Sequence, residues 1–288
     1  MTNRMKRQSI AKETVEILER GSYMCTAGQT VTIDELLQNA VANTTHYGPN
    51  AFDDVFAARD AALQQSTGVT ETRFEVINTT TLAAARSLVD KDPSRRVVCL
   101  NFASAKNPGG GFLSGSQAQE ESLARATGLY ACINGVREYY DTNRECGTCL
   151  YTDHMIYSPD VPAFRDDRDE LLSAPYSVSI ITAPAVNAGA LAKSQPDQIE
   201  KIANTMIHRI EKVLALAVAH GHRSIVLGAW GCGVFKNDPR NVAEWFHDRL
   251  CTQVTLRYAF DRVIFAILDT TTDLDIIRPF QDRFSENL

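Results

Sequence analysis

The residues best suited to chemistry are two adjacent carboxylates that follow a run of three glycines. Seven residues separate Gly109-Gly110-Gly111 from Gln119-Glu120-Glu121. A carboxylic acid can protonate a leaving oxygen and its carboxylate can then activate water, which is how acidic residues break glycosidic bonds. Three successive glycines allow left-handed backbone and let a ligand approach the main chain closely. Each motif alone also has an ordinary structural explanation, as a flexible turn or as acids that complement a helix dipole.

The two carboxylates are expected to have different functions. Adjacent positions of a helix project about 100° apart, since there are 3.6 residues per turn. We therefore expect Glu120 and Glu121 not to converge on one atom. One carboxylate can carry out the acid–base chemistry while the other orients the bound molecule.

A second loop of small residues lies later in the chain, between Gly228 and Pro239, directly after the apolar stretch 225–227. It contains Gly231-Cys232-Gly233-Val234-Phe235, and spaced glycines can turn backbone N–H groups toward phosphate oxygens. Phe235 could fill the core, the commoner position of a phenylalanine, but in a polar loop it is better placed to pack against a sugar or base. The two glycine loops predict opposite walls of a cleft.

Hydrophobic periodicity predicts the elements that carry these loops. We expect strands at residues 29–33, 74–77, 96–102, 177–181, 224–227 and 263–268, and helices at residues 7–20, from 34, at 81–89, 117–134 and 196–219, and after Pro239. Several strands are almost continuously apolar, which is typical of a sheet covered by helices on both faces. The pattern predicts an α/β fold with three α/β/α layers. In such sheets, ligands bind beyond the carboxyl ends of the strands.

The N-terminal part of the chain is expected to be an extension of the main domain. The polar region 43–50 carries Thr, Gly and Pro signals that could separate the two parts. We place a soft boundary so that residues 1–70 form an extension packed on the core and residues 71–288 form the catalytic domain.

Composition excludes several classes of function. The 288 residues include 29 basic and 35 acidic side chains, a net charge of −6, without a long block of like charge. General binding to nucleic acid or to an anionic membrane is therefore not expected. We expect no signal peptide, since charged residues interrupt the apolar ones near residues 10–16, and the sequence has no stretch of about 18 apolar residues. Seven scattered cysteines fit a reducing compartment, so we expect a cytoplasmic location, or a nuclear one in a eukaryote.

The glycine and glutamate motifs together resemble the signature of the microbial-type poly(ADP-ribose) glycohydrolases, a branch of the macrodomain superfamily. The stretch from Gly228 to Phe235 is similar to the second phosphate loop of that family. The helix with Ala11-Lys12-Glu13-Thr14 is similar to its N-terminal extension. The resemblance thus covers nearly the whole chain. One departure is Lys236, where the family pattern favours a small residue, and it bears on the conformation of the second loop.

The resemblance implies a macrodomain-like mixed sheet and hydrolysis of the ribose–ribose O-glycosidic bonds of poly(ADP-ribose), which releases ADP-ribose. It implies that Glu121 is the catalytic carboxylate, which protonates the departing oxygen and then helps water attack the anomeric carbon, and that Glu120 holds a ribose hydroxyl. No metal or cofactor is expected. The predicted substrate contacts are Asn107, Gly109, Gly110, Gly111, Gln119, Gly231, Cys232, Gly233, Val234 and Phe235.

Three alternatives stay open at this point. Asn107 is equally explained as a turn residue before Pro108. The same fold could bind ADP-ribose without cutting it, although such a module has no requirement for adjacent acids. A hydrolase that removes single ADP-ribose units from ADP-ribosylated protein also fits. We expect a monomer in each case.

Other residues suggest functions that we reject. Cys146-Gly147-Thr148-Cys149 has the spacing of half a metal site, but no second pair stands at a suitable interval. Surface or helix-end positions explain the single histidines His154, His208, His220 and His222. Ser114-Gly115-Ser116 lacks the Gly-x-Ser-x-Gly pattern of a nucleophile elbow.

Overall fold

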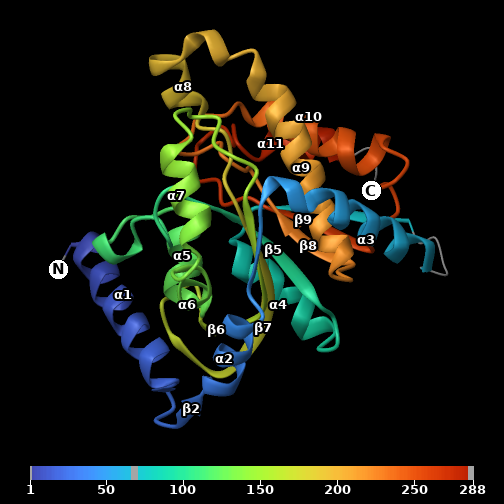
Figure 1. Ribbon diagram of the computed structural model, residues 1–288. Coiled ribbons are helices and arrows are strands. Elements are labelled where there is room, and N and C mark those ends of the chain that lie inside the picture. Colours follow the sequence, from blue (N-terminus) through green and yellow to red (C-terminus); the bar gives the residue numbers. More distant parts are fainter. Residues whose placement is uncertain (1, 66–70, 285–288) are drawn as a thin grey trace.

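The computed structural model describes residues 2–65 and 71–284. Among these residues, one seven-stranded sheet has the order β3-β6-β7-β5-β8-β9-β4, and β1 and β2 form a separate hairpin. Figure 1 shows the central strands with helices around them. The strands are β1 (Ser22–Met24), β2 (Thr30–Thr32), β3 (Thr45–Tyr47), β4 (Arg73–Ile77), β5 (Val97–Phe102), β6 (Met155–Arg165), β7 (Leu171–Ala183), β8 (Ser224–Leu227) and β9 (Arg262–Ala266).

Helices cover both faces of this sheet. They are α1 (Asn3–Arg20), α2 (Asp34–Ala42), α3 (Phe52–Gln65), α4 (Thr81–Lys91), α5 (Gln119–Ala126), α6 (Leu129–Ile133), α7 (Arg137–Glu145), α8 (Ala188–Ser194), α9 (Lys201–Ala219), α10 (Pro239–His247) and α11 (Arg278–Phe284). Short 3₁₀ turns lie at η1 (Pro49–Ala51), η2 (Phe112–Ser114) and η3 (Pro196–Gln198), and a π-helical turn at η4 (Asp248–Thr252). None of the described helices is long and apolar enough to cross a membrane.

The direction of the strands places the two glycine loops side by side. Strands β7, β5, β8, β9 and β4 run parallel, whereas β6 is antiparallel to both β3 and β7. Strand β5 is the direct neighbour of β8, with Val98 opposite Ile225. Because parallel strands end at one edge of a sheet, the chain segments after β5 and after β8 leave that edge together.

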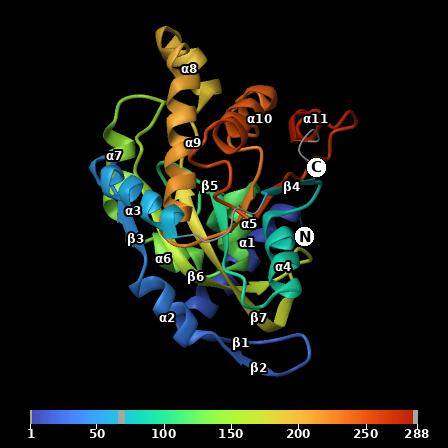
Figure 2. The ribbon, with the colours of Figure 1, turned by 90° about the vertical axis from the view of Figure 1, so that its right-hand side faces the viewer.

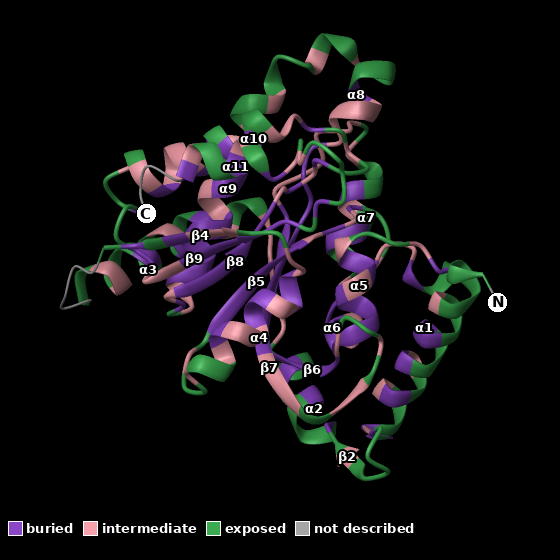
Figure 3. Cartoon of the chain, turned by 180° about the vertical axis from the view of Figure 1, so that it is seen from behind, coloured by how far each residue is buried: buried purple, intermediate pink, exposed green. Residues whose placement is uncertain are grey.

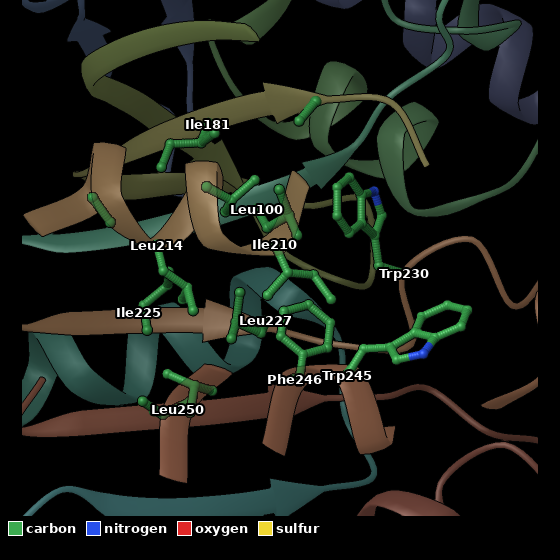
Figure 4. Packing of buried hydrophobic residues seen from close by; sticks show 14 of the residues in the cluster. Leu100, Ile181, Ile210, Leu214, Ile225, Leu227, Trp230, Trp245, Phe246 and Leu250 are labelled. Carbon is green, nitrogen blue, oxygen red and sulfur yellow. The ribbon is translucent and has the colours of Figure 1, made fainter. Parts of the chain in front are cut away.

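Strand β5 is apolar throughout most of its length because its two faces serve two different cores. Val98 and Leu100 pack with α3, α9 and α10, whereas Val97 and Cys99 pack with α4, α5 and α6 on the opposite face. Figure 4 shows the first core, in which Ile210 and Leu214 of α9 lie against Leu100 and the side chains of β8. Figure 2 shows the helices on either side of the sheet. Buried residues concentrate on the strands (Figure 3).

Helix α1 lies outside these layers and packs on the segment between β5 and α5. Ala11 shares a small buried cluster with Phe112 and Ala124. Arg4 and Arg7 donate hydrogen bonds from their Nε atoms to the carbonyl oxygens of Ser114 and Gly115, at 2.9 and 2.8 Å. The N-terminal helix therefore contacts the backbone that follows the triple glycine.

The predicted three-layer α/β architecture with a mixed sheet and an N-terminal helix is confirmed. The helix expected at 117–134 is divided into α5 and α6 at Thr127 and Gly128, and the helix expected from 196 begins at Lys201. The sequence pattern does not predict strand β6, since Pro159 and Pro162 interrupt its apolar residues.

The polar region 43–50 contains β3, an edge strand of the main sheet. Helix α3 packs along α9, within the larger core. The boundary expected after residue 70 falls at residues 66–70, which lie outside the described residues, and the division of the chain stays a prediction.

We expect the substitution Leu100→Ala to lower the free energy of unfolding by about 2–5 kcal/mol, because a buried leucine of the central strand leaves a cavity that its neighbours only partly fill. The side chain of Leu100 is 1% exposed, whereas that of Val254 is 88% exposed. Val254→Ala is the control and should change the free energy by less than about 0.5 kcal/mol. Urea denaturation of both variants measures the difference. Equal effects would contradict this assignment of the core.

Candidate active site

A cleft of ≈ 1190 Å³ opens at the carboxyl ends of the parallel strands. We call residues 103–118, between β5 and α5, the first loop, and residues 228–238, between β8 and α10, the second loop. All the predicted site residues except Gly109 line this cleft. The structure thus brings together two segments that are more than 100 residues apart in the sequence.

Glu120 lies at the floor of the cleft, in the first turn of α5, and is only 2% exposed. Its Oε2 accepts the backbone N–H of Ser104 at 2.7 Å, and its Oε1 accepts Nδ2 of Asn101 at 3.3 Å. Burial raises the pKa of Glu120 to about 8, the charge of Glu121 acts in the same direction, and N–H donors from Ser104, Asn101 and Gly109 oppose both. Glu120 is therefore largely protonated at neutral pH.

Glu121 approaches the first loop from the same turn of α5. Its Oε1 accepts the N–H of Gly111 at 2.9 Å. A Cβ atom at Gly110 would lie 2.5 Å from Oε1 of Glu121 and 3.1 Å from Oε2 of Glu120, and Gly110 has the left-handed φ of 59°. Both carboxylates therefore reach the same glycine, and the 100° between their helix positions does not keep them apart.

Gln119 fixes the start of α5 against the end of β5. Its Oε1 accepts the N–H of Phe102 at 2.9 Å, and its Nε2 donates to the carbonyl of Leu100 at 2.8 Å and to Oγ1 of Thr81 at 3.1 Å. The residue lines the cleft, as the sequence predicts, but its polar atoms bond to the protein. Its geometry positions the two glutamates.

The backbone amides of the triple glycine are used within the protein. The N–H groups of Gly109 and Gly111 bond to Glu120 and Glu121, and that of Gly110 donates to the carbonyl of Asn107 at 2.9 Å. Gly109 packs against Phe112, so it lies behind the surface of the cleft. The first loop holds carboxylates in this structure. The exposed side chain of Asn107 lines the cleft.

The second loop presents free amides to the cleft. Within the part of the chain that the structure describes, the N–H groups of Gly231, Gly233, Val234 and Phe235 have no acceptor. Asn237 shapes the loop from behind, since its Nδ2 donates to the carbonyls of Val186 and Gly231 at 2.8 and 3.2 Å. Successive free N–H groups of this kind form an anion-binding concavity.

Three side chains complete the second loop. Burial raises the pKa of Cys232 to about 12, which keeps this thiol neutral and excludes a thiolate nucleophile. Phe235 is half-buried beside Tyr151, with ring centroids 6.0 Å apart. Lys236 has a φ of 60°, a left-handed conformation that favours glycine. The departure at position 236 thus coincides with a backbone position where a small residue is expected.

A family model matches residues 11–166, and its description is microbial-type PARG, catalytic domain. The chain belongs to this family. The match spans the first loop, both glutamates and helices α2–α7, which together include the floor of the cleft. A comparison of the sequence with curated proteins finds no match.

Solved structures of bacterial members are similar over almost the whole chain. Poly(ADP-ribose) glycohydrolase from Thermomonospora curvata is 45% identical, with a TM-score of 0.90, and the alignment covers 97% of this chain and all of that one. The same enzyme bound to the inhibitor ADP-HPD gives 45% identity and a TM-score of 0.89 over the same shares. The enzyme from Deinococcus radiodurans in complex with ADP-ribose is 43% identical, with a TM-score of 0.80, covering 87% of this chain and 97% of that one.

Some residues of the site are not evident from the sequence. Asn101 and Ser104 hold Glu120, Arg7 holds the first loop, and Asn237 holds the second. Asn101 could have been found from the sequence, since it is a polar residue within an otherwise apolar strand that is buried on both faces. Arg7 could not, because its partner is 108 residues away.

We expect Glu120→Gln to stabilise the protein relative to the native chain as pH rises from 5 to 8.5. The folded-state pKa of about 8 lies above the ordinary 4.5, so the native glutamate contributes its full stability only below about pH 4.5 and loses it as pH rises through 8. Glutamine does not titrate, and the difference should reach a few kcal/mol, because a change of one in pKa corresponds to about 1.4 kcal/mol. Urea denaturation at both pH values measures it.

The control for this prediction is Glu145→Gln, at an exposed position of α7. Its stability relative to the native chain should be nearly the same at pH 5 and pH 8.5. If the difference in free energy of unfolding between Glu120→Gln and the native chain is also the same at both pH values, the carboxyl of Glu120 is ionised in the folded protein.

Proposed function

We propose that this chain hydrolyses the ribose–ribose O-glycosidic bonds of poly(ADP-ribose) and releases ADP-ribose. The observation that carries the proposal is the pair of carboxylates, Glu120 and Glu121, gathered at Gly110 on the floor of a cleft. Membership of the family and the similarity to two bacterial poly(ADP-ribose) glycohydrolases support the same activity.

The second loop is proposed to bind the diphosphate of ADP-ribose. The N–H groups of Gly231, Gly233, Val234 and Phe235 are available for phosphate oxygens, whereas those of the triple glycine are already bonded. Phe235 packs against the sugar or base of the substrate, and the exposed amide of Asn107 reaches a ribose hydroxyl at the opposite wall. In this arrangement the diphosphate lies opposite the two glutamates.

The reaction needs acid–base chemistry from the two carboxylates and a water molecule. Glu121 protonates the departing ribose oxygen and then helps water attack the anomeric carbon. Its Oε1 is held by Gly111 and its Oε2 makes no hydrogen bond to the described residues, so one oxygen is free for the substrate. Glu120 is anchored through both oxygens and orients a ribose hydroxyl.

The raised pKa of Glu120 bears on where the proton is stored. Burial favours the protonated form of a carboxyl group, and a neighbouring negative charge favours it further. Burial and the charge of Glu121 both raise the pKa of Glu120. The raised pKa of Glu120 therefore favours a proton on the floor of the cleft beside Glu121, and a general acid requires a proton before the bond breaks.

We expect Glu121→Gln to lower the release of ADP-ribose from purified poly(ADP-ribose) by about 10²–10⁴-fold, because the amide can neither donate the proton nor activate water. Affinity for ADP-ribose, measured by calorimetry, should change little, since the second loop is intact. Glu145→Gln serves as the control and should keep full activity.

The same assay separates the alternative functions. Native protein that binds ADP-ribose but leaves both polymer and ADP-ribosylated protein intact would be a binding module. Removal of single ADP-ribose units from protein, without turnover of polymer, would make it a mono-ADP-ribosyl hydrolase. Either result would refute the proposed activity on polymer.

We expect Gly110→Ala to lower the rate of polymer hydrolysis by about 10²-fold, because a methyl group 2.5 Å from Oε1 of Glu121 must displace the carboxylate by a large fraction of an ångström. Gly135→Ala is the matched control, since a Cβ atom at Gly135 meets nothing within 4 Å. Steady-state kinetics and circular dichroism of both variants measure the effect. Full activity of folded Gly110→Ala would contradict the close contact between the first loop and Glu121.

A further inference from the structure

A cluster of two histidines and a glutamate lies apart from the cleft. His46 is in the edge strand β3, Glu138 is in the first turn of α7, and His154 directly precedes β6. One potential ligand atom of each residue lies within 4.8 Å of the others, and none of the three residues lines the cleft. The surface or helix-end position expected for His154 is wrong, since the residue is 7% exposed.

The pairing of β3 with β6 brings the two imidazoles together. His46 lies opposite Ile156 in the antiparallel register, two residues beyond His154. The rings are stacked with an interplanar angle of 23°, and Nε2 of His46 is 2.8 Å from Nδ1 of His154. Oε2 of Glu138 lies 3.5 Å from Nδ1 of His46. His154 and Glu138 thus contact different nitrogens of the His46 ring, and one potential ligand atom from each of the three segments lies within 4.8 Å of the others.

Imidazole nitrogens and a carboxylate oxygen are ligand atoms that transition-metal ions bind. Nε2 of His46 and Nδ1 of His154 are 2.8 Å apart, so a proton lies on at most one of these two nitrogens. The other nitrogen accepts the hydrogen bond with its lone pair. Imidazole nitrogens with one carboxylate oxygen are a common ligand set of Zn²⁺, which binds nitrogen at about 2.0–2.1 Å and leaves a fourth position for water. We propose that His46, Glu138 and His154 bind one Zn²⁺ ion.

To accept the ion, the two imidazole rings must turn so that their lone pairs converge, and Glu138 must move from the Nδ1 side of His46 toward its Nε2 side. Ligand atoms in a tetrahedral site lie about 3.3 Å apart, given the usual Zn–N bond length. The two histidine nitrogens would therefore separate by about half an ångström from their hydrogen-bond distance. The side chain of Glu138 is 71% exposed, so it can move inward without disturbing the core.

Such an ion would connect the sheet edge to the helix that lies behind the catalytic floor. Tyr139 and Tyr140, which follow Glu138 in α7, are buried, and the charge of Glu120 acts on the pKa of both. At the other end of α7, Arg144 donates to the carbonyl of Lys106 in the first loop. An ion bound by these three residues would fix α7 against β3 and β6.

The test uses the full chain without an affinity tag, after treatment with a chelator. We expect calorimetry to detect one Zn²⁺ per chain and thermal unfolding to shift to higher temperature with added Zn²⁺. His46→Gln and Glu138→Gln should each weaken binding by at least about tenfold, the effect of losing even an outer-shell partner. His208→Gln and Glu145→Gln, at exposed positions, are matched controls that should bind as the native chain does.

Substitution by Co²⁺ separates this site from cysteine ligands such as Cys146 and Cys149. We expect a spectrum without the charge-transfer band of a cobalt–thiolate bond. Three results would overturn the proposal: no stoichiometric Zn²⁺ binding by the native chain, equal binding by His46→Gln, or a thiolate band with Co²⁺. Polymer hydrolysis is not the readout, so failure here leaves the proposed glycohydrolase activity untouched.

Discussion

The absence of side chains on the triple glycine is the constraint on which the site depends. A Cβ atom at Gly110 would lie 2.5 Å from Oε1 of Glu121, and one at Gly109 would lie 2.9 Å from the ring of Phe112. This contact allows α5 to begin directly beneath the first loop, with its first-turn acids against backbone rather than in solvent. The burial that raises the pKa of Glu120 follows from the same contact. The triple glycine therefore makes room for the two carboxyl groups.

The two glycine loops consequently differ in what their backbones can do. In the first loop the N–H groups of Gly109 and Gly111 are directed at the two glutamates, so the loop holds carboxyl groups that belong to the protein. In the second loop Asn237 ties down carbonyl oxygens and leaves the N–H groups of Gly233, Val234 and Phe235 free. The second loop is therefore the part of the cleft to which we assign the anionic ligand. This assignment separates the diphosphate from Glu121 in the reaction that we propose.

The sequence predicted the layers, the central strands and the residues that line the cleft, because apolar runs and glycine motifs are local signals. It did not predict β6, because prolines interrupt the apolar residues of this strand. It also did not predict that β3 joins the main sheet, because the three polar residues of β3 show no strand pattern. The partners of the glutamates also depend on long-range contacts. Gln119 illustrates the difficulty, since its position in the motif was predicted but its bonds to Phe102 and Leu100 become visible only when β5 and α5 are placed together.

The carbonyl oxygens of the first loop explain why the N-terminal helix belongs to the site. Arginine side chains donate to carbonyls along this loop, at Lys106 from Arg144, at Ser114 from Arg4, at Gly115 from Arg7 and at Ser116 from Arg125. Carboxylates accept the loop's N–H groups from within the site, and guanidinium groups donate to its carbonyls from outside. A loop bonded on both sides by such groups is fixed before any ligand arrives, which preorganises the two acids for the hydrolysis that we propose. Two of these arginines come from α1, so the N-terminal helix contributes directly to the rigidity of the floor of the cleft.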